Sequence, residues 1–589
     1  MKYKQQLFDY AVKDYKRTLK DYSHKSITIL LDIDNEHAFF SIAPLSQALH
    51  ELHSDIYLVS HSKGNSPEFE TLQKLWPVYK EYETNKRGTH TKYLSKFISE
   101  INKKSSKDLS KLFRPSSLVI KTDKSSFTAG KLKLPYKYKW HKPYRVTKLK
   151  SACKKVWSEV FDLKKSETIE INLPLLPPEG ILKLPLEDYL DSYAIVWHLK
   201  NAAQALKAFP LLQSSTDRVS PIEPAERVGD LILTLRGCEY SKQIKNPIFS
   251  AYTELSKELK LPALKPSAAR LMIRPQGFPG KHRFGSYIGY PTPNNKTKWT
   301  SPTSMFMKLE DYPQSQYEDR KPATRLALTE TLPIDVFSET VNIDFKSLRK
   351  ISNKLYDSLK GCILINVVSH ENKKGPATNL IVDIANRKLI PDNGDVTSLV
   401  DAEALKRTKK YYGRYTNIPC GEVFLTPESM QGTFVGDVVI AVDRSIKLTE
   451  DEPIIVDVED GRYTIRQAPG HILERIQHTK DAQMEVLKEN EKNKTLPQEL
   501  INQYKDNFNR IGEFAINTHP TARLCDYLVV NEKIARMMHI ALGAGFESDR
   551  KTVYHFDIVF NAAKQKLDVY GVKPDGTEVW VLRKGRMVV

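Results

Sequence analysis

The chain has 589 residues, of which 40% are hydrophobic and 27% charged, and its formal net charge at pH 7 is +19. This balance is typical of a folded globular protein and excludes a disordered, a collagenous and a membrane-spanning class. The length exceeds what one compact core accommodates, so we expect two domains, or one domain with large elaborations.

We expect no targeting or anchoring segment. A membrane span needs a run of about 18 apolar residues, which this chain lacks, and its first residues, MKYKQQLFDYAVKDYK, are polar. The cysteines are scattered without a C-x-x-C pair, which favours a reducing compartment and argues against a zinc ribbon or a disulfide framework. They are Cys153, Cys238, Cys362, Cys420 and Cys525. We therefore predict a cytoplasmic protein with no membrane partner.

The beginning of the chain has the alternation of an α/β domain. The pattern predicts a helix over residues 3–20, a strand at 26–33, a helix at 43–53 and a strand at 55–61, which together make one β-α-β unit. Neither G-x-G-x-x-G nor G-x-x-x-x-G-K-[ST] occurs, so a nucleotide cofactor is not expected.

A basic insertion covers about residues 80–165. In KLKLPYKYKWHKPYRVTKLK, residues 131–150, basic residues alternate with tyrosine and tryptophan. Such a segment is either a stacking and phosphate-binding surface for nucleic acid or an edge strand with a solvated lysine face. Solvated lysine faces are common, so the edge strand is the favoured interpretation.

The remainder of the N-terminal domain continues the α/β pattern. We predict a Pro/Leu-rich connector at 171–190, a helix at 196–209 and a buried strand at 230–237. Residues 274–303 are rich in Gly, Pro, Asn and Thr and are expected to form loops or a lid. We place the end of this domain, residues 1–330, near the following change of pattern.

Residues 331–589 are predicted to form a β-rich α+β domain. Several segments alternate with period two, and the last is a hairpin turned by Asp575-Gly576. The segments are CILINVVSH, NLIVDIANRKL, GDVVIAVDRSI, PIIVDVEDGRYTI and LDVYGVKPDGTEVWVL. A charged helical insertion is expected at about 478–508, with Thr495 and Gln498 as a capping box.

Candidate chemistry lies in this second domain, where no H-E-x-x-H, G-x-S-x-G or protease-type cysteine occurs. In VYHFDIVF, His555 and Asp557 are two residues apart on a strand and therefore share a face. They could bind one cation or form a hydrogen-bonded His-Asp pair.

Three other residues have two interpretations each. His539 in KIARMMHIALGAGF is either a metal ligand or a satisfied core or cap histidine. Glu513 in NRIGEFAIN is either a buried carboxylate that needs a cationic partner or an exposed helix glutamate. Glu422 in NIPCGEVFLTP is either a ligand at the start of a strand or a strand-edge charge.

Taken in order, the segments NIPCGEVFLTPE, GDVVIAVDRSI, RIGEFAIN, NEKIARMMHIALGAG and HFD resemble the C-terminal domain of the thermophilic-type metallo-aminopeptidases, the aminopeptidase T and aminopeptidase S family, which is leucyl aminopeptidase-like. The resemblance covers about residues 335–589, whereas the first half shares only its α/β character. It implies a metallopeptidase domain whose metal-binding residues fall on Glu422, Glu513, His539, His555 and Asp557.

Three carboxylates and two imidazoles suit divalent ions such as Zn²⁺, Co²⁺, Mn²⁺ or Mg²⁺, and the set can hold a pair of them. The resemblance implies an aminopeptidase that releases N-terminal amino acids from peptide substrates through a metal-activated water, with Glu422 or Glu513 as the base. It also implies a homodimer.

One departure from the family concerns catalysis. Where the family has a tyrosine seven residues after its I-H-x-A-L-G histidine, this chain has Phe546, which lacks the hydroxyl. The alternative hypothesis is therefore a catalytically weakened metallopeptidase-like protein whose basic N-terminal half binds nucleic acid or an acidic partner. The helical insertion before Glu513 and the long basic N-terminal region also exceed the family pattern, and they could cover the site or bind a partner.

Overall fold

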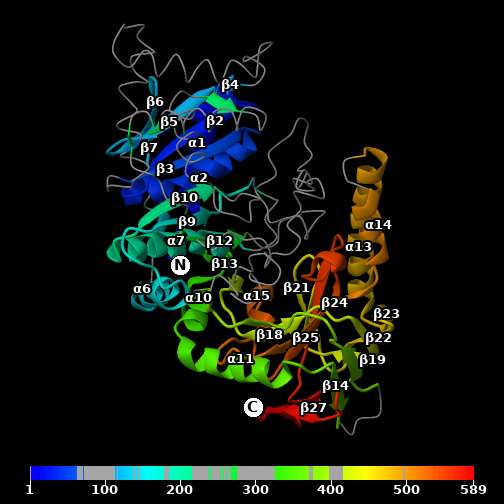
Figure 1. Ribbon diagram of the computed structural model, residues 1–589. Coiled ribbons are helices and arrows are strands. Elements are labelled where there is room, and N and C mark those ends of the chain that lie inside the picture. Colours follow the sequence, from blue (N-terminus) through cyan, green and yellow to red (C-terminus); the bar gives the residue numbers. More distant parts are fainter. Residues whose placement is uncertain are drawn as a thin grey trace.

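The fold is described from a computed structural model of the chain. The described residues are mainly 2–62, 117–136, 146–177, 185–214, 267–274, 325–370, 376–396, 415–494 and 498–589, with short stretches at 71, 113–115, 140–142, 179, 238–240, 253, 256–257 and 260–261. In Figure 1 the first half of the chain, from blue to teal and green, lies beside the second half, which runs from bright green at α10 and α11 to red at the C-terminus.

The first sheet has the strand order β3-β2-β5-β6-β7. Its strand β2 runs parallel to β3 and β5, while β6 and β7 continue antiparallel. The strands are β2 (Ser26–Asp32), β3 (Asp55–His61), β5 (Leu118–Thr122), β6 (Ser126–Ala129) and β7 (Leu132–Pro135). The predicted strands at 26–33 and 55–61 are confirmed, and β2 is buried along nearly its whole length, as parallel strands usually are.

Two helices flank these strands in the sequence. Helix α1 (Gln5–Leu19) confirms the prediction at 3–20. Helix α2 (Glu36–Glu51) begins seven residues before the predicted start, because the side chain of Asn35 accepts a hydrogen bond from the backbone N–H of Ala38 and so caps the first turn.

The described part of the basic insertion favours the edge-strand interpretation. Strand β7 lies at the edge of the sheet and pairs only with β6 among the described strands. Trp140 is fully buried, with its ring centroid 5.3 Å from that of Phe8, so it belongs to the core and is not exposed for base stacking.

The second sheet is entirely parallel, with the order β10-β9-β12-β13-β17. Its strands are β9 (Thr168–Leu173), β10 (Phe209–Ser214), β12 (Ala269–Arg274), β13 (Arg325–Glu330) and β17 (Tyr415–Asn417). The predicted connector at 171–190 is wrong at both ends, since it begins in β9 and ends in α7 (Leu186–Ala205). The helix predicted at 196–209 overlaps only the second half of α7, which ends at Ala205, and its last residue already begins β10. Because α7 is buried on most sides, no amphipathic pattern marks its start.

Two predicted segments lie outside the described residues. They are the strand at 230–237 and, after Arg274, the Gly/Pro-rich segment at 274–303. The predicted boundary near residue 330 falls at the end of β13, but β17, from residues 415–417, adds a further strand to the same sheet. The two halves of the chain are thus joined through a shared sheet edge.

The second half contains two antiparallel sheets. The larger has the order β23-β22-β19-β15-β14-β27-β28-β29 and the smaller β16-β18-β24-β25-β26-β20-β21. The larger sheet consists of β14 (Leu364–Ser369), β15 (Asn379–Asp383), β19 (Ser429–Gly436), β22 (Ile454–Glu459), β23 (Arg462–Gln467), β27 (Leu567–Val572), β28 (Glu578–Arg583) and β29 (Arg586–Met587). The predicted period-two strands are confirmed, and two predicted segments are hairpins: β20 with β21 and β22 with β23.

The smaller sheet consists of β16 (Ile390–Asp392), β18 (Glu422–Leu425), β20 (Val439–Ala441), β21 (Ser445–Lys447), β24 (Ile511–Asn517), β25 (Met538–Gly543) and β26 (His555–Phe560). Side chains of both sheets form one hydrophobic cluster, so the sheets pack against each other. Helices α13 (Gly470–Lys492) and α14 (Gln498–Asp506) contribute apolar residues to that cluster.

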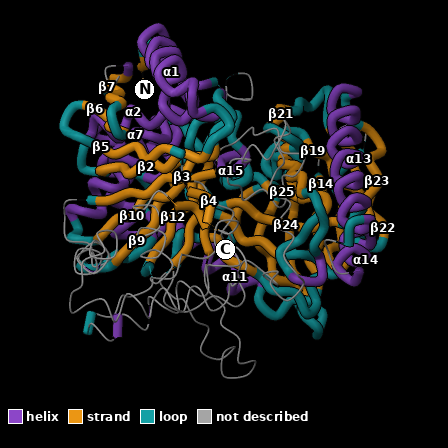
Figure 2. The backbone as a smooth tube through the Cα atoms, turned by 90° about the horizontal axis from the view of Figure 1, so that it is seen from above, coloured by secondary structure: helices purple, strands orange, loops and turns teal. Residues whose placement is uncertain are grey.

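The helical insertion is therefore larger than predicted, and it begins at Gly470. Its apolar residues pack into the cluster between the sheets, so its described part supports this core. Thr495 lies outside the described residues. In Figure 2 the two helices lie at the far end of the second half, away from the first half.

A separate apolar cluster connects the two halves. It joins Met272, Leu326 and Leu328 of the parallel sheet to Phe424 and Ala515 of the smaller antiparallel sheet. The face of β18 and β24 that carries Phe424 and Ala515 is thus directed toward the first half.

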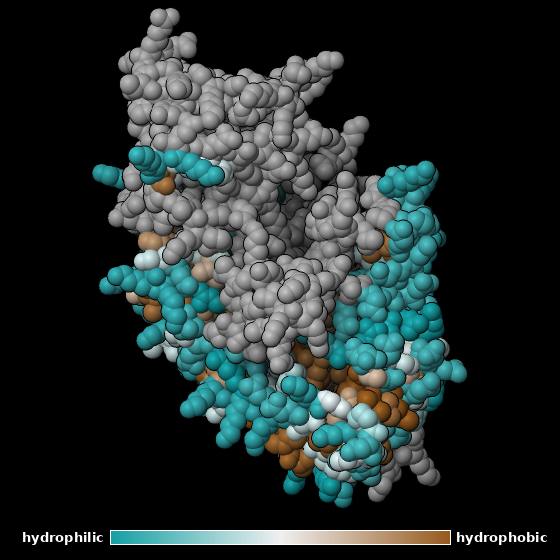
Figure 3. All heavy atoms as spheres, in the orientation of Figure 1, coloured by the Kyte–Doolittle hydropathy of each residue, from teal (hydrophilic) through white to brown (hydrophobic). Residues whose placement is uncertain are grey.

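None of the described helices is both long and apolar enough to cross a membrane. Figure 3 shows apolar surface mainly over the second half in this view.

Candidate metal centre

The five candidate residues lie on four neighbouring strands of the smaller sheet. Glu422 begins β18, Glu513 lies in β24, His539 in β25, and His555 and Asp557 in β26. The strands are adjacent in the order β18-β24-β25-β26. Residues separated by as many as 135 positions in the chain are therefore brought to one part of one sheet.

The strand register places all five side chains on the same face. Glu422 pairs with Asn517, which is on the same face as Glu513 four residues earlier. Ala541 pairs with Glu513 on one side and with Asp557 on the other, so these carboxylates flank a small residue. The alternate residues of the same strands enter the hydrophobic cluster on the opposite face. The sheet thus has one apolar face and one face with a buried polar group.

A β-bulge at Gly512 is needed for this arrangement. Ile511 pairs with Leu542 and Glu513 with Ala541, so two residues of β24 span one step of β25. Without the bulge, Ile511 and Glu513 would share a face. A Cβ atom at Gly512 would lie 2.1 Å from the carbonyl oxygen of Ala544, which explains why glycine stands there.

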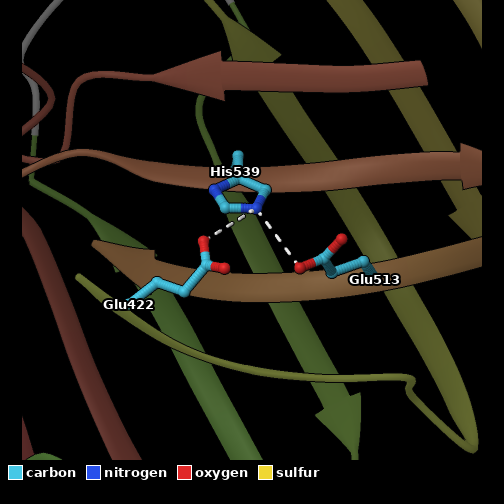
Figure 4. A group of neighbouring side chains, drawn as sticks. All are labelled: Glu422, Glu513 and His539. Carbon is cyan, nitrogen blue, oxygen red and sulfur yellow. Dashed lines mark hydrogen bonds and ion pairs between the residues drawn. The ribbon is translucent and has the colours of Figure 1, made fainter. Parts of the chain in front are cut away.

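The first ligand group consists of Glu422, Glu513 and His539, all buried. The Nε2 atom of His539 lies 3.4 Å from Glu513 Oε1 and 3.6 Å from Glu422 Oε2. Figure 4 shows both carboxylates directed at the same ring nitrogen. These distances exceed those of strong hydrogen bonds, whereas ligands about 2.1 Å from one tetrahedral ion lie roughly 3.4 Å apart.

The second group consists of Glu513, His555 and Asp557. The Nε2 atom of His555 lies 2.9 Å from Asp557 Oδ1 and 3.2 Å from Glu513 Oε2. His555 and Asp557 therefore form a close His-Asp pair, with a second carboxylate beside it. Glu513 belongs to both groups, one through each oxygen.

Both imidazoles are oriented by their other ring nitrogen. His539 Nδ1 lies 2.9 Å from Asn517 Oδ1, and His555 Nδ1 lies 2.7 Å from the carbonyl oxygen of Ala544. Each acceptor requires a proton on Nδ1, so in the neutral ring Nε2 presents its lone pair to the carboxylates. This is the usual arrangement of histidines that bind a metal.

Burial and the neighbouring ionisable groups shift the pKa values of Glu513 and His555. Burial raises the pKa of Glu513, but the neighbouring imidazoles of His539 and His555 outweigh it and lower the pKa below its usual range. Burial lowers the pKa of His555, yet Asp557 and Glu513 raise it well above its usual value. In the absence of an ion, a proton on His555 thus partly neutralises the carboxylates.

Two further residues belong to this centre and were not found from the sequence. Lys533 is buried, and its Nζ atom lies 2.5 Å from Glu422 Oε1 and 3.7 Å from Asp392 Oδ2. Asp392 pairs with Glu422 across β16 and β18. A lysine in the charged segment NEKIAR looks like a surface residue, and nothing local in the sequence marks it as buried.

Phe546 lies beside the second group. Its ring centroid is 5.7 Å from that of His555 and 4.8 Å from that of Phe424, in edge-to-face arrangements. It also packs against the apolar cluster that joins the two halves. The position where the resemblance leads us to expect a tyrosine therefore lies next to the candidate ligands, and the side chain there carries no hydroxyl.

The donor set fits divalent metal ions. Carboxylate oxygens and imidazole nitrogens are the ligands such ions prefer, and the ligand atoms within each group lie within 4.8 Å of one another. Glu422 Oε2 is buried and accepts no hydrogen bond from the part of the chain that the structure describes. A buried carboxylate oxygen in this position is costly unless a cation binds it.

Comparisons with known proteins give little beyond this geometry. No protein-family model and no curated protein matches the chain. Among solved structures, wild-type AmpT from Thermus thermophilus is similar at 15% sequence identity, over 75% of this chain and 100% of that one, with a TM-score of 0.39. A likeness of this size does not establish a function, which must be argued from the site itself.

Proposed function

We propose that this protein is a metal-dependent peptide hydrolase that releases N-terminal amino acids from peptides. The observation that carries the proposal is the shared carboxylate of Glu513, whose two oxygens face two different histidines at 3.4 and 3.2 Å. A carboxylate shared in this way suits two neighbouring ions. Glu422 and His539 would complete one position, and His555 and Asp557 the other.

When bound, the ions supply an acidified water and polarise the scissile carbonyl. The chain's own contribution is to hold the ligands in place. Asn517 and the Ala544 carbonyl keep Nε2 of both imidazoles turned toward the carboxylates. Glu422 or Glu513 would be the carboxylate that takes a proton from the attacking water. The apolar face around Phe424 and Phe546 limits the access of bulk water.

Action on peptide N-termini is supported by the ordered resemblance of the surrounding segments to the metallo-aminopeptidases. The five residues occupy the positions that this resemblance assigns to ligands. A homodimer and a cytoplasmic location stay predictions from the sequence.

The test combines metal analysis with amino-acid release. Purified protein is expected to bind close to two equivalents of Zn²⁺, Co²⁺ or Mn²⁺, and to release single residues from a mixed peptide pool. Glu513→Gln removes the shared carboxylate and is expected to abolish release and lower the metal content.

The matched control is Asp437→Asn. Asp437 is also a partly buried carboxyl group of the second half, but its partner is the backbone N–H of Asn561. This variant is expected to keep both metal and activity. Full activity in Glu513→Gln, or wild-type protein that binds no divalent ion, would refute the proposal.

A further inference from the structure

Lys533 introduces an asymmetry into the candidate metal centre. Its ammonium contacts Glu422 Oε1 at 2.5 Å, Glu532 Oε1 at 3.0 Å and Asp392 Oδ2 at 3.7 Å. The lysine side chain is 1% exposed. An ammonium group in contact with three carboxylates therefore lies at one end of the ligand set.

The backbone holds this lysine in place. Lys533 follows the short helix α15 (Leu528–Asn531), and its N–H donates to the carbonyl of Val530. Its own carbonyl accepts a hydrogen bond of 2.9 Å from the N–H of His519. The ring of His519 in turn is fixed by the carbonyl of Thr340. These bonds fix the backbone of Lys533 within the connection between β24 and β25.

The contact with Lys533 occupies one of the two carboxylate oxygens of Glu422. Oε1 is held by the ammonium, so only Oε2, 3.6 Å from His539 Nε2, is directed at the first ligand group. An ion there would meet a carboxylate whose charge is already partly neutralised. In the second group, by contrast, the 2.9 Å partner of Asp557 is His555, itself a candidate ligand.

We propose that Lys533 is a positioning residue that makes the two metal positions unequal. The ion bound by Glu513, His555 and Asp557 is held tightly, whereas the ion bound by Glu422, Glu513 and His539 is held weakly and exchanges with free ions. The second ion then acts as a regulator, because occupancy of the complete centre follows the concentration of free divalent metal. This inference rests on the proposed function for the existence of two positions.

The experiment is a calorimetric titration of Mn²⁺ into the full-length chain after removal of metal with a chelator. Wild-type protein is expected to bind two ions in separate steps, with dissociation constants that differ roughly tenfold or more. Lys533→Met removes the charge and is expected to tighten the second step by roughly tenfold. Lys533→Arg keeps the charge and is expected to retain the wild-type difference.

Lys200→Met is the matched control. Lys200 is also buried and lies 3.6 Å from a carboxylate, that of Asp34 in the first half, so its loss is expected to leave both binding steps unchanged. Equal affinities in wild-type protein, or an unchanged second step in Lys533→Met, would overturn the inference while leaving the proposed function intact. Protein that binds no ion at all would instead refute the proposed function.

A further pair of variants keeps the inference testable if Lys533→Met does not fold, which circular dichroism would show. Glu422→Gln is expected to lose the weak step and keep the tight one. Asp557→Asn is expected to lose the tight step. The opposite assignment, with the tight ion lost in Glu422→Gln, would overturn the inference.

Discussion

Gly512→Ala tests whether the bulge in β24 positions the metal centre. The added methyl carbon would lie 2.1 Å from the carbonyl oxygen of Ala544 and 2.4 Å from its carbonyl carbon. Carbon and oxygen in ordinary contact are roughly 3.3 Å apart, so β24 and the segment that carries Ala544 must separate by roughly 1 Å. The carbonyl oxygen of Ala544 accepts the hydrogen bond from His555 Nδ1, and Glu513 directly follows Gly512 in β24. The substitution therefore disturbs two candidate ligands at once.

Two measurable effects follow from this displacement. Overpacking of a buried strand costs about 1–3 kcal/mol in the free energy of unfolding. Misplacement of the group that orients a metal-binding histidine lowers metal affinity by about 10- to 100-fold. Urea unfolding of the metal-free protein measures the first effect, and calorimetric titration with Mn²⁺ measures the second.

The control is Gly470→Ala at the start of α13, where a Cβ atom would meet no other atom within 4 Å. It is expected to leave metal binding unchanged and stability equal or slightly higher. If Gly512→Ala binds Mn²⁺ with wild-type affinity and unfolds at the wild-type urea concentration, the argument from the bulge is refuted.

Three other predictions concern stability and catalysis. Burial lowers the pKa of His519 to about 4. The neutral ring therefore stabilises the fold at pH values above the unfolded pKa near 6.5, and this stability is lost as the pH falls toward 4, by at most about 3 kcal/mol in the free energy of unfolding. His519→Gln should flatten this part of the pH profile of urea unfolding, and the exposed control His471→Gln should not. Phe546→Tyr places a hydroxyl beside the second ligand group and is expected to raise kcat for amino-acid release by roughly tenfold or more, whereas an unchanged kcat would separate this position from catalysis. Arg387→Met breaks ion pairs of 2.6, 2.8 and 2.9 Å with three carboxylates and should cost about 2 kcal/mol in urea unfolding, against less than about 1 kcal/mol for the exposed Arg466→Met.

The sequence predicted strands best where hydrophobic residues alternate strictly. His555 and Asp557 were placed on one face of a strand from their spacing alone, and the register of β25 and β26 agrees. Helix α7 was misjudged because its side chains are buried on most sides, which removes the amphipathic period that marks a helix start. A helix or strand was predictable from the sequence to the extent that it has one solvent-exposed face and one buried face.

The centre itself depends on features that a single segment does not contain. The sequence left Glu513 between a buried carboxylate and an exposed helix glutamate, because the one-residue slip at Gly512 appears only when β24 is paired with β25. Lys533 is 111 positions from Glu422, and its burial follows from the connection between those strands and its neighbours. The local sequence pattern could suggest candidate ligands, but it could not show which residues contact them in the folded chain.

The same four strands must satisfy two opposite demands, and this fixes the register of the strands that carry the centre. Their alternate residues fill a dry cluster against the larger sheet, so a shift of one residue would bury the carboxylates in that core and expose its apolar side chains. Retaining the apolar face therefore fixes the register that brings Glu422, Glu513, His539, His555 and Asp557 together. Because the cost of burying these charges is met by their neighbours and, on our proposal, by metal ions, removal of metal should weaken the centre locally while the sheet that carries it stays folded.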